Sequence, residues 1–236
     1  MIESIRWWGS RACGLLLPLF VLLEVNYPTL SPQSQLAVFA TLGLVLLFLS
    51  PKREEAESAV AWSGLAAVVG AALTIVVGAY LVVQTEPVFE SLWIDGRSLG
   101  DRAGVEASID ILVGVLGLAL ILIATWRSIG VALPILAGLF LVYGYWGAVL
   151  PDWLLPHRGY DVSRLVGQTF LHSQGVFGVA LKVMFNYVFL FVVFGALLEA
   201  TGATEFIIES TRRRFRRSPG GAAKVSVISS GLMGSL

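Results

Sequence analysis

The chain has 236 residues, of which 56% are hydrophobic and only 14% are charged, and its mean hydropathy is +0.81. Soluble globular domains carry about 25% charged residues, so this composition excludes a soluble enzyme core. Sixteen basic residues balance sixteen acidic ones. Because there is no excess of positive charge to hold a polyanion, we exclude nucleic acid as a partner.

Long apolar runs divide the chain into segments that match the thickness of a bilayer. A membrane-spanning helix needs about 17 to 25 mostly apolar residues. The run at 131–150 rises ~1.5 Å per residue and is therefore about 30 Å long, the thickness of the hydrocarbon core. The pattern predicts an all-α integral membrane protein with six spans, at 7–23, 34–50, 59–83, 109–126, 131–150 and 176–199.

The positions of lysine and arginine predict the orientation of these spans. If the N-terminus is cytoplasmic, six crossings place eleven of the sixteen basic residues inside and five outside. Loops that stay in the cytoplasm carry the excess of basic residues in membrane proteins. We therefore expect a cytoplasmic N-terminus.

Small residues recur every four positions in the third span, at Ala66, Gly70, Thr74 and Gly78. On a helix they form one stripe, which favours close packing against a neighbouring helix over a substrate path. The following outer loop, 84–108, is acidic and interrupted by glycines. We expect this loop to be mostly irregular.

A second outer segment, 151–175, follows the fifth span. Its sequence predicts a short amphipathic helix along the outer surface, because mostly apolar side chains recur at helical spacing beside polar neighbours. Those residues are Val162, Leu165, Val166, Thr169 and Phe170. The segment also holds His157 and His172, but it has no cysteine and no histidine/glutamate pair at metal-site spacing. We therefore expect no metal site here.

The residues after the sixth span begin with a basic cluster, Thr211 to Arg217. This cluster marks a cytoplasmic face and can meet anionic lipid. Ser218 and Pro219 come next, a capping hydroxyl followed by proline at the first helical position. The sequence therefore predicts a new helix that begins at Pro219.

Half of the stretch from Val225 to Leu236 is serine or glycine. Such a helix is weak toward its end, and at membrane depth it is tolerated only when it is buried in protein or faces a water-filled cavity. Broken helices of this kind carry the substrate and ion sites of secondary transporters, while a tightly packed helix interface is the other interpretation. The chain ends inside this element, so we expect it to be a fragment.

Five motifs in the C-terminal half carry a resemblance. They are His157-Arg-Gly-Tyr160, Gly175-Val-Phe-Gly178, the run from Tyr187 to Glu199, Thr201-Gly-Ala, and the run from Gly220 to Gly234. Together they resemble the fused permease of tripartite ATP-independent periplasmic (TRAP) transporters, in the branch served by TAXI-type binding proteins. The N-terminal part resembles that family mainly in its pattern of spans.

The resemblance implies three parts. Residues 1–127 would be a small-subunit-like four-helix membrane domain, 128–175 a connecting helix with the periplasmic segment, and 176–236 the truncated start of a large transport domain. The last residues would form the first limb of a re-entrant hairpin whose tip, near Ser235, helps hold the coupling ion and substrate. The nominated binding residues are Ser229, Ser230, Gly231, Gly234 and Ser235.

The resemblance implies a permease of the bacterial inner membrane and not an enzyme, and the chain has no nucleotide-binding G-x-x-x-x-G-K-[ST] motif. The full protein would import a small organic acid with sodium or a proton as coupling ion, and it would need no cofactor. A periplasmic binding protein would deliver the acid. We expect it to dock on the rigid outer helix, at Arg158 and Arg164, because a rigid surface loses less entropy on binding. A non-transporting helical scaffold that braces a partner is the alternative.

Overall fold

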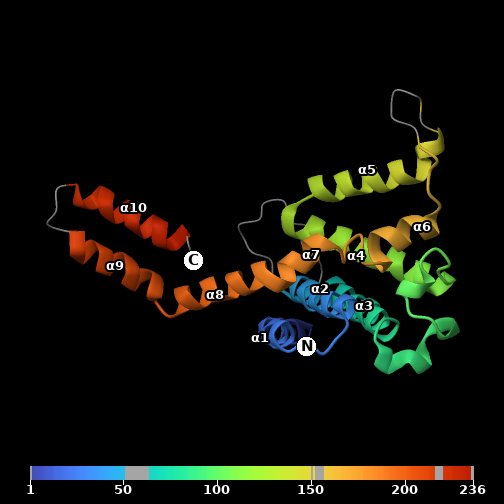
Figure 1. Cartoon of the computed structure of the whole chain (residues 1–236), viewed down its shortest axis with the longest axis horizontal. Helices are drawn as coiled ribbons and strands as arrows, with labels where there is room; N and C mark the ends of the chain where they lie inside the picture. Colours follow the sequence, from blue (N-terminus) through green and yellow to red (C-terminus); the bar gives the residue numbers. More distant parts are fainter. Residues whose placement is uncertain (1, 51–63, 150, 152–156, 216–219, 235–236) are drawn as a thin grey trace. The chain divides into compact units, whose positions relative to one another are not determined.

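The computed structural model describes residues 2–50, 64–149, 151, 157–215 and 220–234. Every regular element in these ranges is a helix, which confirms the all-α prediction (Figure 1). The chain forms two compact units, residues 1–182 and 183–236. Each unit is described by itself below.

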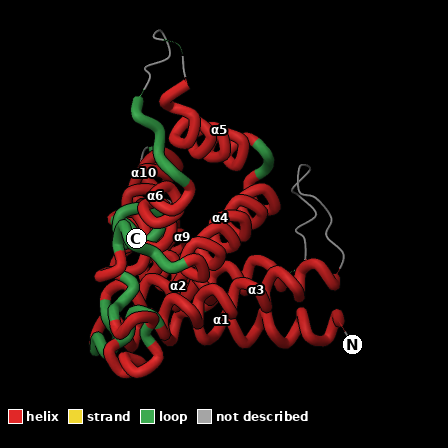
Figure 2. Tube along the Cα trace, turned by 90° about the vertical axis from the view of Figure 1, so that its right-hand side faces the viewer, coloured by secondary structure: helices red, strands yellow, loops and turns green. Residues whose placement is uncertain are grey.

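The first three helices of the first unit lie side by side (Figure 2). They are α1 (Ile2–Asn26), α2 (Pro32–Leu49) and α3 (Gly64–Val83). Ser31 caps α2 by accepting a hydrogen bond from the backbone N–H of Ser34, and proline occupies the first helical position. The serine satisfies one free N–H group of the helix start, and the proline has no N–H to satisfy, so α2 begins where its sequence provides a cap.

The small-residue stripe of α3 packs against α2, as predicted. A methyl group on Gly70 would come within 2.9 Å of the Phe48 ring, and one on Gly78 would overlap Thr41. Both glycines are buried, and so is Thr74 between them. Small side chains allow two helices to approach closely, so the stripe is a helix contact.

The loop between α3 and α4 (Ser108–Ile129) is more ordered than predicted. Three short 3-10 helices account for half of it: η1 (Pro87–Leu92), η2 (Ile94–Gly96) and η3 (Gly100–Arg102). The expectation of a mostly irregular loop is therefore wrong for half of the loop, and the reason is a set of buried polar contacts between residues that lie apart in the sequence.

A buried ion pair anchors this loop to α4. Arg102 and Asp110 are 2% and 0% exposed, and their nearest nitrogen and oxygen atoms are 2.8 Å apart. Asp110 also accepts hydrogen bonds from the Tyr80 hydroxyl and the Ala107 backbone N–H. The Arg102 guanidinium donates to the Gln84 side chain and to two loop carbonyls. Buried charges are tolerated only when they are paired and hydrogen-bonded in this way.

The fifth span is α5 (Ala132–Trp146), which continues into a 3-10 turn, η4 (Gly147–Val149). Gly130 connects α4 to α5 with a φ of 106°, a conformation that glycine adopts without steric cost.

The predicted amphipathic helix is present as α6 (Val162–Val166) and a π-helical turn, η6 (Gly167–Leu171). Its apolar face packs on α4, whereas a helix on the membrane surface would bury that face in lipid. Val166 and Phe170 are buried against Gly114 and Gly117, where an added methyl group would overlap them. The two glycines of α4 therefore make room for the outer helix.

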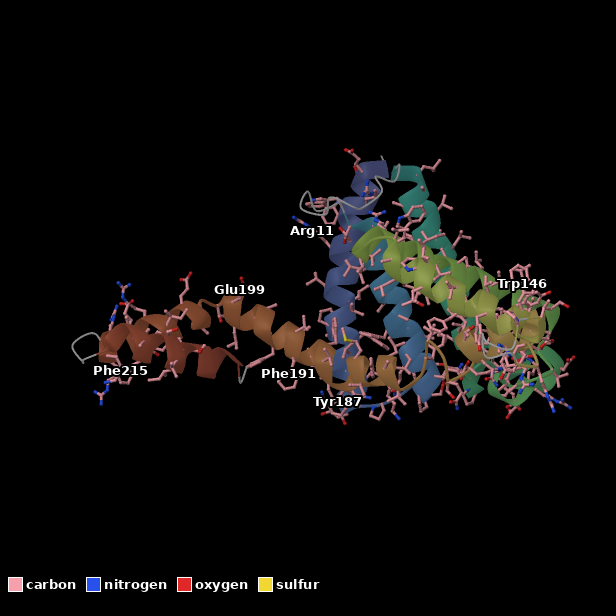
Figure 3. The ribbon with its side chains drawn as sticks, turned by 90° about the horizontal axis from the view of Figure 1, so that it is seen from above. Arg11, Trp146, Tyr187, Phe191, Glu199 and Phe215 are labelled. Carbon is pink, nitrogen blue, oxygen red and sulfur yellow. The ribbon has the colours of Figure 1, made fainter. Side chains whose placement is uncertain are left out.

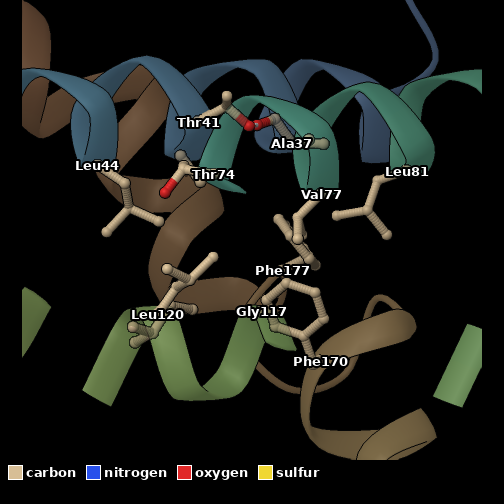
Figure 4. Close-up of a pocket in the computed structure, with 13 residues that line it drawn as sticks. Ala37, Thr41, Leu44, Thr74, Val77, Leu81, Gly117, Leu120, Phe170 and Phe177 are labelled. Carbon is tan, nitrogen blue, oxygen red and sulfur yellow. Dashed lines mark hydrogen bonds between the residues drawn. The ribbon is translucent and has the colours of Figure 1, made fainter. Parts of the chain in front are cut away.

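A small space lies where α2, α3, α4 and η6 meet (Figure 4). Its volume is about 20 Å³, enough for about one water molecule. The hydroxyls of Thr41 and Thr74 reach its wall, but each donates to a carbonyl of its own helix, on Ala37 and Gly70. Because both hydroxyls are occupied, we assign this space to packing and not to a ligand.

The sixth span consists of α7 (Val179–Val183), a π-helical turn η7 (Met184–Val188) and α8 (Phe189–Ala200). Figure 3 shows Tyr187, Phe191 and Glu199 along it. Gly202, with a φ of 71°, ends this helix. In the second unit α9 (Ala203–Phe215) and α10 (Gly221–Gly234) then lie side by side (Figure 1).

Among the described residues, six helices are long and apolar enough to cross a membrane, which confirms the six-span prediction. The predicted start of the third span, residue 59, lies outside the described residues. In the described part of the chain this helix begins at Gly64. The spans are Arg6–Asn26, Pro32–Leu49, Gly64–Val83, Ser108–Ile129, Ala132–Val149 and Val179–Ala200.

Candidate functional site

The C-terminal end of α10 contains four of the five nominated binding residues. Ser229, Ser230 and Gly231 follow one another in the helix, and Gly234 is its last residue. Ser235 lies outside the described residues. The candidate site is therefore the last turn and a half of α10.

Ser229 differs from the other described serines of α10. Its Oγ atom is buried and has no hydrogen-bond partner in the described part of the chain. Ser230 donates its hydroxyl to the Val227 carbonyl at 3.2 Å and is exposed, as is Ser226. A buried hydroxyl without a partner costs free energy. Ser229 is thus the nominated residue whose geometry favours a ligand most.

The start of α10 differs from the prediction. The sequence predicts a helix from Pro219, but α10 begins at Gly221, because Gly220 adopts a left-handed φ of 67°. Ser218 and Pro219 themselves lie outside the described residues. The helix is also continuous to Gly234, so the expected weakening toward its end does not set in over this range. Packing against α9 supports helices whose own propensity is low.

The sequence did not lead us to expect α9, because its residues read as a basic link after the sixth span. Arg212, Arg213 and Arg214 all lie in its last turn. Positive side chains stabilise a helix there, because its C-terminal end carries a partial negative charge. Arg213 also forms an exposed ion pair with Glu209, one helical turn earlier, at 2.9 Å. This i,i+4 pair of opposite charges is the sequence signal from which the helix could have been predicted.

The nominated docking residues lie on the outer segment of the first unit. Arg158 and Arg164 are both exposed. The Arg164 guanidinium lies 5.1 Å from the centre of the Tyr160 ring, and the backbone N–H of Tyr160 donates to the Gly144 carbonyl of α5 at 2.9 Å. The structure thus places both arginines on one segment that is fixed to α5.

His157 has a structural role in that segment. Its Nδ1 atom accepts a hydrogen bond from the Gly159 backbone N–H, so Nε2 carries the proton and donates to the Tyr143 carbonyl at 3.1 Å. The centre of the imidazole lies 4.9 Å from that of the Tyr143 ring and 5.5 Å from that of the Tyr160 ring. Both ring nitrogens are therefore occupied. Over the described ranges no group of three or more potential metal ligands comes together.

Glu106 connects the two outer segments, a role that no pattern in the sequence indicated. Its carboxylate accepts hydrogen bonds from the Gly104 backbone N–H and the Ser163 hydroxyl, and it lies 3.1 Å from Nε2 of His172. Burial opposes its charge, but these hydrogen bonds outweigh burial and lower the pKa of Glu106 to about 2. The carboxylate therefore stays ionised at neutral pH and holds α6 and η6 on the loop. Its partners lie 57 and 66 residues away in the sequence.

A comparison with protein families gives one match. The family described as "Tripartite ATP-independent periplasmic transporter, DctM component" matches residues 116–236, just over half of the chain. The matched region begins in α4 and contains the outer segment, the sixth span and the α9–α10 hairpin. A search of curated proteins and a search of solved structures each found no match.

Proposed function

Since the chain belongs to the DctM component family of TRAP transporters, we propose that it is the permease of a secondary transporter that imports a small organic acid together with sodium or a proton. The family consists of multi-pass transport proteins of the inner membrane and not of enzymes, which confirms those two expectations. The organic acid and the coupling ion are part of the proposal.

The buried Oγ atom of Ser229 is the observation that carries this proposal. Secondary transporters place hydroxyls, freed carbonyls and helix ends of interrupted helices around their ion and substrate. A hydroxyl oxygen can replace part of the hydration shell of a cation, and a serine is small enough to leave room for the ion. We therefore propose that Ser229 and its neighbours Ser230, Gly231, Gly234 and Ser235 contribute to the ion and substrate site.

The proposed organisation follows the family. Residues 1–127 would brace the transport part, 128–175 would connect the two, and 176–236 would begin the transport part. The match over 116–236 supports the transport part, while the fusion to a small-subunit-like part and the TAXI-type branch rest on the resemblance of the motifs and spans. The charge distribution supports a cytoplasmic N-terminus.

A periplasmic binding protein is the partner that membership in a tripartite system implies. We propose that it docks on the outer segment at Arg158 and Arg164. Replacing both arginines by glutamate should weaken its binding about tenfold at low salt, because the attraction becomes repulsion, and by less at high salt, where exposed charges are screened. Binding of the purified protein to the permease at two salt concentrations measures this effect.

The matched control is Arg97→Glu, which reverses one exposed charge on the other outer loop. The affinity of this variant for the periplasmic binding protein should stay close to that of the parent permease. Equal binding by the double variant and the parent at both salt concentrations would remove the outer segment from the interface.

Uptake into proteoliposomes tests the proposed function. The permease is expressed from its complete open reading frame, reconstituted, and supplied with a binding protein loaded with radiolabelled organic acid in the absence of ATP. We expect uptake only when an inward sodium or proton gradient is imposed. Correctly inserted protein that takes up nothing under either gradient would favour the scaffold interpretation instead.

A further inference from the structure

Two arginines of the first unit converge on a single acceptor. Arg6 lies near the start of α1, and Arg127 lies in the last turn of α4. Arg127 donates to the Ser50 carbonyl at 2.9 Å, and Arg6 reaches the same oxygen at 3.4 Å. Neither arginine forms an ion pair with a residue in the described ranges. Two positive groups therefore share one neutral oxygen.

This oxygen does not balance the charge of the two guanidinium groups. Ser50 caps the C-terminus of α2, where the helix contributes a partial charge of about −0.5, against a full positive charge on each arginine. In addition, Nε of Arg6 and Nη1 of Arg127 are buried and have no hydrogen-bond partner among the described residues. An anion with several acceptor oxygens would balance the positive charge and accept hydrogen bonds from both of these N–H groups.

Tryptophans place the pair at the depth of the lipid headgroups. Trp7 and Trp8 follow Arg6 directly, Trp126 precedes Arg127, and all three indole rings are exposed. Exposed tryptophan gathers where the bilayer meets water. Lipid phosphates lie at this same depth. Both arginines are only partly buried, so a headgroup at the surface can reach them.

We propose that Arg6 and Arg127 bind the phosphate of one anionic phospholipid. Arginine forms paired hydrogen bonds with phosphate oxygens, and basic pockets between membrane helices hold such headgroups. The phosphate would connect the ends of α1, α2 and α4, three helices that meet at Ser50. This site does not involve α10, so it stands independently of the proposed transport function.

Lipid titration followed by native mass spectrometry tests the site. The permease from the complete open reading frame is delipidated and titrated with phosphatidylglycerol, with phosphatidylcholine of the same acyl chains, and with inorganic phosphate. We expect one saturable site that prefers phosphatidylglycerol. In the Arg6→Gln/Arg127→Gln variant the affinity for phosphatidylglycerol should fall about 25-fold, since each arginine near the surface contributes about fivefold. Arg6→Lys/Arg127→Lys should keep part of the affinity, because it keeps the charge.

Arg11→Gln is the matched control. Arg11 is an exposed arginine at the same end of α1, and its guanidinium stacks on Trp7 at 3.6 Å from the ring centre. This variant should bind like the parent if the site is specific. Equal affinity in the parent and the double glutamine variant would overturn the proposal, as would displacement of the lipid by inorganic phosphate at equal concentration. If the double variant does not fold, Arg6→Gln alone should show the fivefold loss.

Discussion

Replacing Asp110 by asparagine should lower the free energy of unfolding of the first unit by about 3 to 5 kcal/mol. The substitution leaves the Arg102 guanidinium, which is 2% exposed, without its counter-charge. It also weakens the acceptor for the Tyr80 hydroxyl. Thermal unfolding of the purified permease in detergent should show a melting temperature lower by about 10 °C.

Arg97→Gln is the control for this prediction, because Arg97 is an exposed arginine of the same loop. Its effect should stay within about 0.5 kcal/mol. If Asp110→Asn unfolds at the same temperature as Arg97→Gln, the buried ion pair does not hold the loop on α4.

A methyl group at Gly117 should destabilise the contact between α4 and η6 by about 1 to 3 kcal/mol. The new carbon would overlap the Phe170 ring, which is buried. This ring packs edge-on against that of Phe177, with 5.4 Å between the two ring centres. The ring cannot move away without losing that packing. We expect Gly117→Ala to lower the melting temperature and to raise hydrogen exchange over 162–171.

Two further variants separate a local clash from a general effect of alanine. Gly43 of α2 has open space where a methyl group would lie, so Gly43→Ala should be neutral or stabilising, since alanine favours a helix over glycine. Adding Phe170→Leu to Gly117→Ala should restore part of the lost stability. A Gly117→Ala variant as stable as Gly43→Ala would contradict the packing described for α6 and η6.

The spans were predictable because hydropathy is a local property. Each apolar run specifies its own helix, and the observed bounds of the five spans described in full lie within about three residues of the predicted ones. The stripe at Gly70 and Gly78 was predictable for the same reason, since its spacing lies within one helix.

The contacts that order the outer face were not predictable, because each joins residues far apart in the sequence. Glu106 meets Ser163 and His172, and no pattern around any of them indicates the others. The resemblance nominated α10, but the nomination could not rank its serines. That ranking depends on which side of α10 is covered in the folded protein, where Oγ of Ser229 is buried while Ser230 stays exposed.

The ion dependence of Ser229 variants tests the central claim most directly, that α10 contributes to the ion site of a secondary transporter. Uptake is measured in proteoliposomes over a series of sodium concentrations and a series of pH values, for Ser229→Ala, Ser229→Val and Ser226→Ala. Alanine removes the hydroxyl oxygen and keeps the size, valine also adds bulk, and Ser226 is an exposed control on the same helix.

We expect Ser229→Ala to raise the ion concentration for half-maximal uptake about tenfold, the loss of one bond to a charged group, with unchanged protein yield. Ser226→Ala should behave like the parent. Normal ion dependence in Ser229→Ala, together with misfolding of Ser229→Val, would contradict the claim and show that Ser229 is a packing residue.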